Sequence, residues 1–191
     1  MRVSILSLLV LCFAVLNANT AEIGDDGLHK QPWFSTSFKD VAEDIQTATE
    51  EGKRLAIIFE QRGCIYCRKL HMEVLSDPKV ANYIKENFVV VQYNLYGDEE
   101  VTDLDGKVLT EKTAARKWRV VFTPTIMFLP EKAKTGEDVG QAAVSTMPGA
   151  FGKGTTLHMF EWIRAKGYDS GEPFQRYHAR RLVEEPNPNM D

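Results

Sequence analysis

The sequence predicts a single α/β domain in which a mixed β-sheet is flanked by helices on both faces. Three observations lead to this fold class. Short apolar runs typical of buried strands alternate with segments whose apolar residues recur at helical spacing. The 191 residues are 43% hydrophobic and 26% charged, which excludes a disordered or low-complexity chain. The length suits one domain with a full hydrophobic core, and the net charge of −4 argues against a nucleic-acid-binding protein.

The first 21 residues have the composition of a secretory signal peptide. Arg2 precedes an almost unbroken apolar run that ends at Leu16, and small and polar residues follow as far as Ala21. The run is shorter than the roughly 20 residues that a membrane-spanning helix needs. An uncleaved membrane anchor is the alternative, and a lipid on Cys12 is a weaker one because Leu11 precedes that cysteine. We therefore predict an exported protein that keeps two cysteines and is soluble in an oxidising compartment.

The N-terminal half of the mature chain predicts a leader, a helix and a buried strand. Residues 22–36 are polar and contain glycine and proline, so we assign them to a leader segment that lies on the domain. The domain itself is assigned to residues 37–170. Apolar residues at helical spacing from Phe38 to Ala48 predict a helix with Ser37 as its N-cap. The short run at 55–59, Leu-Ala-Ile-Ile-Phe, predicts a buried central strand.

The rest of the domain alternates helices and strands. Helices are predicted to begin at Cys64, after a break at Gly63, and at Pro78, because proline is favourable in a first turn. Further helices are predicted at 111–118 and 156–166, further strands at 88–93, 125–129 and 142–146, and turns in the acidic segment 97–109. The C-terminal tail, residues 171–191, contains three prolines and is expected to wrap the surface or fray.

The sequence Cys64-Ile-Tyr-Cys67 lies where a predicted buried strand gives way to a helix. At a helix N-terminus, unpaired backbone N–H groups and the helix dipole favour the thiolate of Cys64. Cys67 follows one turn later, close enough to form a disulfide with Cys64 and shielded beneath it. Cys64 is therefore the expected nucleophile, and Cys67 is the thiol that resolves the mixed disulfide. No cofactor or metal is predicted beyond the redox-active Cys64–Cys67 disulfide.

Other interpretations of this pair remain open on the sequence alone. A purely structural disulfide is one, although so short a loop gains little entropic stabilisation. A non-catalytic metal-binding module using Cys64, Cys67 and His71 is another, because the three residues follow helical spacing. Covalent haem attachment would need a histidine directly after the second cysteine, where this chain has Arg68.

The second candidate element is Thr123-Pro124, at the start of the strand predicted at 125–129. Proline cannot donate a hydrogen bond to the sheet, so it belongs at the first residue of a strand, and such tight positions often hold a cis peptide bond. A strand-opening proline is common by itself. Its combination with an upstream strand, Cys-x-x-Cys and helix is much more specific.

Together these motifs resemble the thioredoxin family. The segments FEQRGCIYCRKLHMEVLSDPKV (59–80), FVVVQYNLYGDEEVTDLDG (88–106) and ARKWRVVFTPTIMF (115–128) are most similar to the SoxW-type periplasmic thioredoxins of bacterial sulfur-oxidation (Sox) clusters. The resemblance implies a thioredoxin fold and a monomeric periplasmic thiol–disulfide oxidoreductase in which Pro124 is a cis-proline facing the cysteines. It also implies a membrane thiol-reductant donor, and a protein thiol or disulfide client such as a SoxY-like sulfur carrier.

Some residues depart from the family pattern. Thioredoxins commonly carry a buried aspartate six residues before the first cysteine, as proton acceptor for the resolving thiol, and here Ile58 occupies that position. Glu60 is the nearest acid and is either a substitute proton acceptor or a solvated strand end. Tyr66 is expected beside the nucleophile, where an aromatic side chain would contact a substrate. Thr123 and Pro124 complete the predicted substrate-binding site.

Three further expectations follow. Trp118 and Phe122 are expected in the core. The five acidic residues between Asp98 and Asp105 are expected to form an insert that recognises a partner, with a solvated loop as the alternative, because their calcium-binding pattern is incomplete. The alternative functions are a disulfide oxidant or isomerase and a reductant for cytochrome c maturation.

Overall fold

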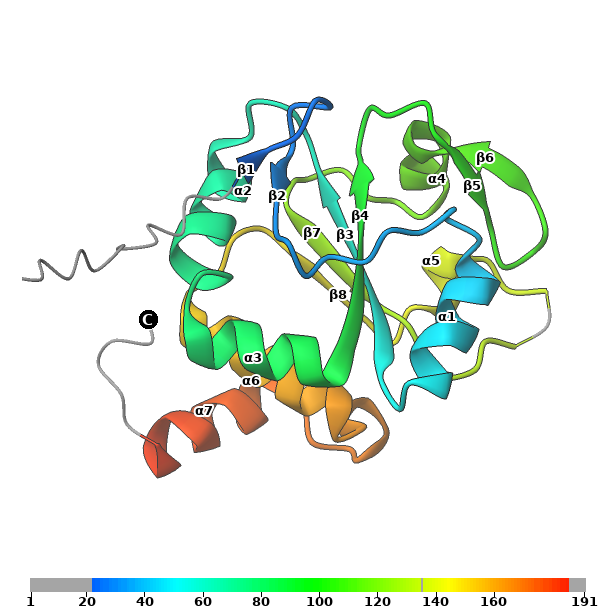
Figure 1. The fold of residues 1–191 in the computed structure, drawn as a ribbon. Coiled ribbons are helices and arrows are strands. Elements are labelled where there is room, and N and C mark those ends of the chain that lie inside the picture. The colour runs from blue at the N-terminus through cyan, green and yellow to red at the C-terminus, as the bar shows by residue number, and fades with distance from the viewer. Residues whose placement is uncertain (1–21, 135, 186–191) are drawn as a thin grey trace, which may run out of the picture.

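A four-stranded mixed sheet forms the centre of the molecule (Figure 1). The computed structural model describes residues 22–134 and 136–185, so the predicted signal peptide at 1–21 and the last six residues of the tail lie outside the described residues. The strands lie in the order β4 (Phe88–Asn94), β3 (Arg54–Glu60), β7 (Thr125–Phe128) and β8 (Ser145–Pro148). β3 and β4 are parallel, whereas β7 is antiparallel to β3 and β8. The prediction of a mixed sheet flanked by helices is confirmed.

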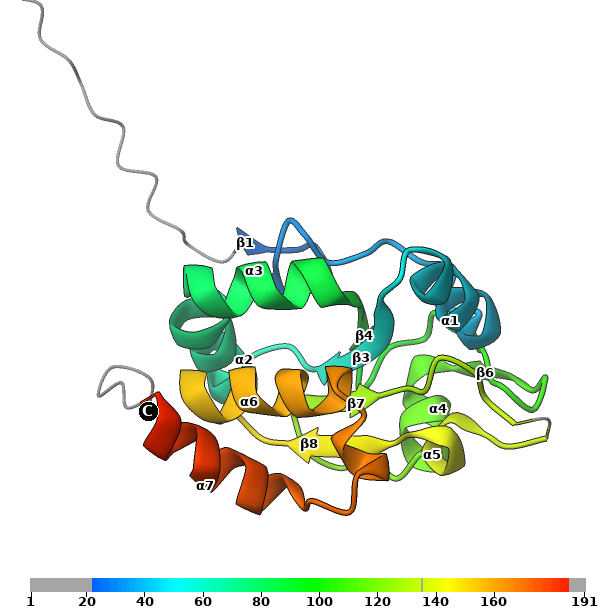
Figure 2. The same ribbon diagram turned by 90° about the horizontal axis from the view of Figure 1, so that it is seen from below.

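Helices cover both faces of the sheet and create two hydrophobic cores (Figure 2). On one face lie α1 (Val41–Glu50), α4 (Glu111–Lys117) and α5 (Val139–Ala142). On the other lie α3 (Pro78–Asn87), α6 (Lys153–Arg164) and the π-helical turn η1 (Leu70–Val74). Successive residues of β3 point to opposite faces. Leu55, Ile57 and Phe59 therefore enter the first core, whereas Ala56 and Ile58 enter the second.

The helix that carries the cysteines begins directly after β3. α2 (Ile65–Lys69) has Cys64 as its N-cap and continues into η1 without a break. Gly63 has a φ of 72°, a left-handed conformation that a residue without Cβ adopts readily, and this allows the sharp turn before the helix. α3 then begins at Pro78, where the carboxylate of Asp77 accepts the N–H groups of the first turn. Both helix starts agree with the sequence prediction.

The start of the first helix differs from the prediction. The N-cap is Asp40, whose carboxylate accepts the N–H groups of Ala42 and Glu43, and the helix begins at Val41. Ser37 instead donates its hydroxyl to Asp44 at 2.7 Å. Phe38, predicted to lie on the apolar face of the helix, precedes the helix and is 98% exposed. Because Asp40 caps the helix and Ser37 bonds Asp44 instead, the helix starts later than the apolar spacing suggested.

The acidic segment forms a hairpin, β5 (Glu100–Thr102) and β6 (Val108–Thr110), and is anchored from within. The buried carboxylate of Asp103 accepts the indole N–H of Trp118 at 2.9 Å, the Lys117 ammonium at 2.7 Å and the N–H of Val139 at 3.0 Å. Asp103 therefore has a structural role, because it fastens the hairpin to the rest of the domain. The strand predicted at 142–146 starts later, at Ser145, because a capping box begins the short helix α5 immediately before it.

The tail contains a helix that was not predicted, α7 (Phe174–Glu184). Pro173 is its N-cap residue, so the proline starts the helix and does not disrupt it. α7 packs against α6 through the rings of Phe174 and Trp162, whose centroids are 5.9 Å apart, and through the ion pair of Arg181 with Glu161 at 3.2 Å. Residues 174–184 therefore do not fray but lie on the surface of the domain as a helix.

The leader segment, residues 22–36, lies along the outer edge of β4 (Figure 1). It opens with a small antiparallel hairpin of β1 (Glu22–Ile23) and β2 (His29–Lys30). Ser35 then forms a parallel bridge with Val91 and donates its N–H to the carbonyl of Val90 at 2.8 Å. An edge strand otherwise presents unpaired backbone groups, so the leader covers part of this edge.

A buried arginine joins the start of β3 to the opposite end of the chain. The guanidinium of Arg54 donates to Glu131 at 3.1 Å and to the hydroxyl of Tyr168, in the 3₁₀ turn η2 (Gly167–Asp169), at 2.8 Å. The pKa of Glu131 lies below its ordinary value because Lys166 donates a hydrogen bond to the carboxylate and Arg54 adds a nearby positive charge. Burial opposes this lowering in part.

Within the described residues, no helix combines the length and the apolar character that a membrane crossing requires.

Candidate active site

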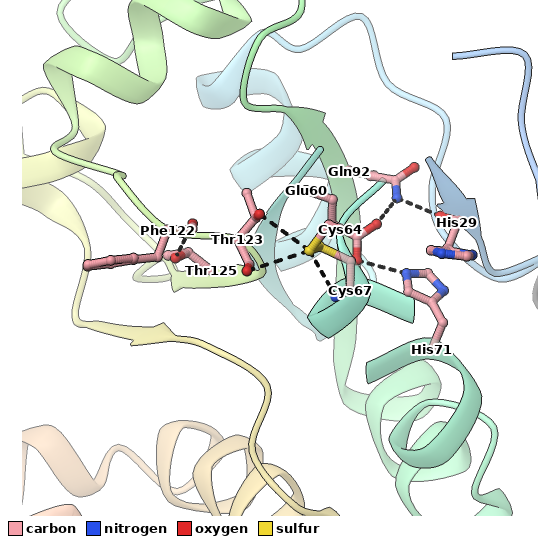
Figure 3. Close-up of a disulfide and its surroundings, with 9 residues drawn as sticks. All are labelled: His29, Glu60, Cys64, Cys67, His71, Gln92, Phe122, Thr123 and Thr125. Atoms are coloured by element: carbon pink, nitrogen blue, oxygen red, sulfur yellow. Dashed lines mark hydrogen bonds and ion pairs between the residues drawn. A yellow bond between two sulfur atoms is a disulfide. The ribbon is translucent and has the colours of Figure 1, made fainter. Parts of the chain in front are cut away.

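The two cysteines form a disulfide at the junction of β3 and α2 (Figure 3). Cys64 is 8% exposed and Cys67 is 1% exposed, so Cys64 is the more accessible of the two residues. Because Cys67 lies one turn into the helix, its side chain is covered by the packing of α2 on the sheet. This asymmetry is the one that a nucleophile and a shielded resolving thiol require.

Hydrogen-bond donors converge on the sulfur of Cys64. The backbone N–H of Cys67 donates to Cys64 Sγ at 2.9 Å, and the hydroxyl of Thr123 donates to the same sulfur at 3.4 Å. The carbonyl oxygen of Thr123 lies 3.6 Å from this sulfur. Two donors and a helix N-terminus favour negative charge on Cys64 once the disulfide is reduced.

The loop opposite the disulfide holds the predicted proline. The Thr123–Pro124 peptide bond is cis, as the sequence predicted, and it directly precedes β7. The carbonyl of Pro124 accepts the N–H of Gly149 at 2.7 Å, which fixes the loop to the end of β8. The structure therefore brings Cys64, Cys67, Thr123 and Pro124 together. Tyr66 is exposed beside them.

Glu60 does not lie at a solvated strand end. The residue is fully buried (0% exposed) at the end of β3. Its Oε1 lies 2.9 Å from Nε2 of His71, and its Oε2 accepts the side-chain amide of Gln92 at 2.6 Å. Ile58, at the position of the family's usual aspartate, is packed in the apolar core. The role of Glu60 as a proton acceptor remains a prediction.

Both ring nitrogens of His71 are engaged in this cluster. Nε2 faces Glu60, and Nδ1 lies 3.3 Å from the side-chain amide of Gln31 in the leader. Among residues 22–134 and 136–185, no three His, Cys, Asp or Glu side chains are placed to hold a metal ion. The alternative of a metal site formed by Cys64, Cys67 and His71 therefore has no support in the geometry.

The leader contributes residues that the sequence analysis did not identify. The ring of His29 lies 5.6 Å from that of His71, and the backbone carbonyl of His29 accepts from Gln92 at 2.7 Å. Burial, together with the nearby His71, lowers the pKa of His29 below its ordinary 6.5. Gln92 carried a sequence signal, because it is the polar residue in the apolar run FVVVQY. Gln31 carried none, because it stands in a polar segment.

Exposed apolar side chains lie near the disulfide, at the start of α2 and in the loop before Thr123. We call Ile65, Tyr66, Val121 and Phe122 the apolar rim; all four are exposed. The first two follow Cys64 directly, and the last two precede Thr123, which contacts the same sulfur. Phe122 was expected in the core, and that expectation is wrong because its side chain is 65% exposed. Trp118 is buried, as predicted.

Comparison with known proteins identifies the family. The model of the thioredoxin-like domain family matches residues 41–146, more than half of the chain. No curated protein matches. A thioredoxin from Thermus thermophilus is 27% identical, with a TM-score of 0.53 over 70% of this chain and 90% of that one. A thioredoxin-fold protein from Helicobacter pylori is 18% identical, with a TM-score of 0.57 over 70% of this chain and 86% of that one. The chain belongs to the thioredoxin-like domain family and carries the Cys-x-x-Cys pair of a thiol–disulfide oxidoreductase.

Proposed function

We propose that this protein is an exported reductant that transfers two electrons to a disulfide or thiol adduct on a client protein. The convergence of two hydrogen-bond donors on the sulfur of Cys64, the more exposed residue of the pair, supports thiol–disulfide exchange with Cys64 as the nucleophile. Donors to the thiolate by themselves raise the reduction potential, so the reducing direction is supported by the resemblance to SoxW-type thioredoxins. Export to the periplasm is supported by the composition of residues 1–21.

The different environments of Cys64 and Cys67 assign each cysteine its step in the exchange reaction. In the reduced protein, the Cys64 thiolate attacks a client disulfide, a bond forms between the two sulfurs, and the client's other sulfur leaves as a thiolate. The Cys67 thiol then loses its proton and attacks Cys64 Sγ, which expels the client's second sulfur and leaves the Cys64–Cys67 disulfide. We assign the proton of Cys67 to Glu60, the buried carboxylate at the end of β3. A membrane thiol-reductant donor would restore the dithiol.

The apolar rim suggests the kind of client. Four exposed apolar side chains beside the reactive sulfur favour an extended protein segment that carries apolar residues next to its own cysteine. The resemblance of residues 59–80 and 115–128 to SoxW-type thioredoxins supports a role in sulfur oxidation, with a SoxY-like sulfur carrier as the client.

The direction of electron flow is open to direct measurement. We expect a reduction potential nearer to that of thioredoxin, about −270 mV, than to that of DsbA, about −120 mV. Equilibration with glutathione and quantification of both forms by mass give the value. A potential near the DsbA end would make donation to a client unfavourable and would favour the oxidant or isomerase alternative.

The role of the apolar rim is tested with Phe122→Ser. We expect reduction of a protein disulfide, such as that of insulin, to fall by about fivefold, the loss typical of an exposed aromatic contact residue. Reduction of the small disulfide DTNB should not change. Phe38→Ser is the matched control, because Phe38 is also exposed and precedes α1. Equal losses for both variants, or for both substrates, would contradict a client-binding rim.

The identity of the client is tested by trapping. The Cys67→Ser variant cannot resolve the mixed disulfide, so the client should remain attached to Cys64 in the producing cells. The double variant Cys64→Ser/Cys67→Ser is the control. Recovery of a periplasmic sulfur carrier would support the sulfur-oxidation role. Recovery of other periplasmic proteins only would remove that role and leave the exchange function standing.

A further inference from the structure

A buried acid and a buried histidine lie together beside the active-site helix. Glu60 and His71 are both 0% exposed, and Glu60 Oε1 is 2.9 Å from His71 Nε2. Burying such groups is costly unless each finds partners. The proposed exchange assigns the Cys67 proton to Glu60 and gives His71 no role, so the pairing of the two side chains needs an account of its own.

Gln31 of the leader determines which nitrogen of His71 carries the proton. Its side-chain amide group can only donate, and it lies 3.3 Å from Nδ1, so Nδ1 must be the acceptor. The proton of the neutral ring is then on Nε2, which donates it to Glu60. The same Gln31 amide lies 3.4 Å from the backbone carbonyl of His71, which holds it in place.

The other carboxylate oxygen is held in the same manner. Gln92 donates its amide to Glu60 Oε2 at 2.6 Å, and its own oxygen accepts from the Lys30 ammonium at 2.7 Å. Lys30 pairs with Asp26 at 2.6 Å. The leader therefore fixes the orientation of both side chains that donate to Glu60. A further titratable group near the pair is His29, on which Arg68 also acts electrostatically.

The carboxylate is placed to exchange a proton with the resolving thiol. Glu60 lies two residues beyond Ile58 on β3, so it shares the face of the sheet on which α2 and η1 pack. Cys67 and His71 are four residues apart on that helical stretch and both are buried. Figure 3 shows the Glu60 carboxylate between the disulfide and the His71 ring. With Cys67 only 1% exposed, its proton has little direct access to solvent.

We infer that the leader segment is a working part of the redox site, although it lies outside the region that the family model matches. Gln31 holds His71 in the tautomer that donates to Glu60, and this hydrogen bond keeps Glu60 in the state that accepts the proton of Cys67. Gln31 and His71 are positioning residues. The inference rests on the proposed exchange function.

The proton balance closes over one cycle. When the Cys67 sulfur bonds to Cys64 Sγ, the client thiolate leaves and the Cys67 proton passes to a Glu60 oxygen. When a donor dithiol reduces the Cys64–Cys67 disulfide again, Cys67 leaves as a thiolate and takes the proton back. The electrons pass from the dithiol to the client, and Glu60 ends the cycle as it began.

The test separates the two thiol steps with DTNB. Reduced protein and one equivalent of DTNB are mixed in a stopped-flow instrument, and thionitrobenzoate release is followed between about pH 5 and 9. The first equivalent reports the attack by Cys64, and the second reports the attack by Cys67 on the resulting adduct.

The expected effect is confined to the second step. His71→Leu removes a donor to the carboxylate, so the second release should slow about tenfold near pH 6 and recover at high pH, where the thiol ionises unaided. Gln31→Leu should shift the profile in the same direction by about threefold, since it acts through His71. His71→Gln keeps a donor at the position of Nε2 and should restore most of the rate.

Controls make each outcome decisive. Gln46→Leu is the matched control for Gln31→Leu, because Gln46 is an exposed glutamine whose amide contacts Glu50 on α1. Circular dichroism and thermal melting confirm that each variant is folded. An unchanged second-step profile in His71→Leu and Gln31→Leu would overturn the inference, as would equal slowing of both steps. A wild type that never releases a second equivalent would refute the exchange function itself, and the inference with it.

Discussion

Substitution of Thr123 by valine isolates one of the two donors that act on Cys64. Threonine and valine have nearly the same shape, so the variant removes the hydroxyl and leaves the cis-proline loop unchanged. The hydroxyl donates to Cys64 Sγ at 3.4 Å, whereas the carbonyl oxygen of the same residue lies 3.6 Å from that sulfur. The hydroxyl favours the thiolate and the carbonyl opposes it, so the variant shifts the balance against the thiolate.

The geometry gives the size of this shift. A neutral hydrogen bond is worth about 0.5–1.5 kcal/mol, and one to a charged acceptor about 1.5–3 kcal/mol. The diffuse charge of a sulfur acceptor at 3.4 Å and the nearby Thr123 carbonyl weaken this bond, so we take the lower range of about 0.5–1.5 kcal/mol. At about 1.4 kcal/mol per factor of ten, Thr123→Val should reduce the thiolate population of Cys64 by about twofold to tenfold. Because the reduced form loses that stabilisation, the reduction potential should fall by about 10–30 mV.

Two measurements check the prediction. The rate of alkylation of Cys64 by iodoacetamide at mildly acidic pH, where only a small fraction of the thiol is ionised, should fall by the same factor. The rate at alkaline pH, where the thiol is ionised in both proteins, should not change. Glutathione equilibration gives the potential. A faster alkylation or a higher potential in Thr123→Val would refute the assignment of the hydroxyl as a donor to the thiolate.

Three further predictions follow from the same structure. In the reduced wild type at mildly acidic pH, mass mapping should find Cys64 alkylated much faster than Cys67; equal rates would reverse the two roles. Asp103→Ala leaves an indole, an ammonium and a backbone N–H without their buried acceptor, and should cost about 3–5 kcal/mol in urea unfolding. Asp105→Ala is its control and should cost far less. The pKa of Glu131 is lower in the folded protein than in the unfolded chain, so the ionised carboxylate stabilises the fold above about pH 4.5. This stabilisation is lost as the pH falls through the pKa that Glu131 has in the folded protein. Glu131→Gln should therefore be less stable than the wild type at pH 7 and match it in acid.

The elements that the sequence predicted well have local signals. A short apolar run bounded by breakers identified β3, and Asp77-Pro78 identified the start of α3, because a capping residue and a first-turn proline act on their immediate neighbours. The helix of the tail has no such signal. No residue of α7 is buried, and its position depends on contacts with α6, such as Phe174 on Trp162. An apolar spacing rule cannot find a helix that lacks a buried face.

Phe122 shows the opposite error. An apolar residue close to a strand is usually assigned to the core, and Val120 and Trp118 in the same segment are indeed buried. The loop before Pro124 turns Phe122 outward, next to Thr123, whose hydroxyl contacts the reactive sulfur. An exposed aromatic residue next to a functional group is a feature of a binding surface, and only the path of the backbone distinguishes it from a core residue.

The place of Glu60 follows from the periodicity of the strand. Residues of β3 alternate between the two faces, so Ile58 and Glu60 share a face while Phe59 lies on the other. In the family the usual acid occupies the position of Ile58. Glu60 lies two residues further along the strand, on the same face and about 7 Å closer to the cysteines. At Ile58 an acid would lie within the apolar packing of the second core. At the end of the strand, the acid is contacted by the amide of Gln92 and by His71. The amide of Gln31 contacts His71 where the leader covers β4. The leader therefore acts on the displaced acid through its partners, because Gln31 contacts His71 and Lys30 contacts Gln92 from outside the region that the family model matches.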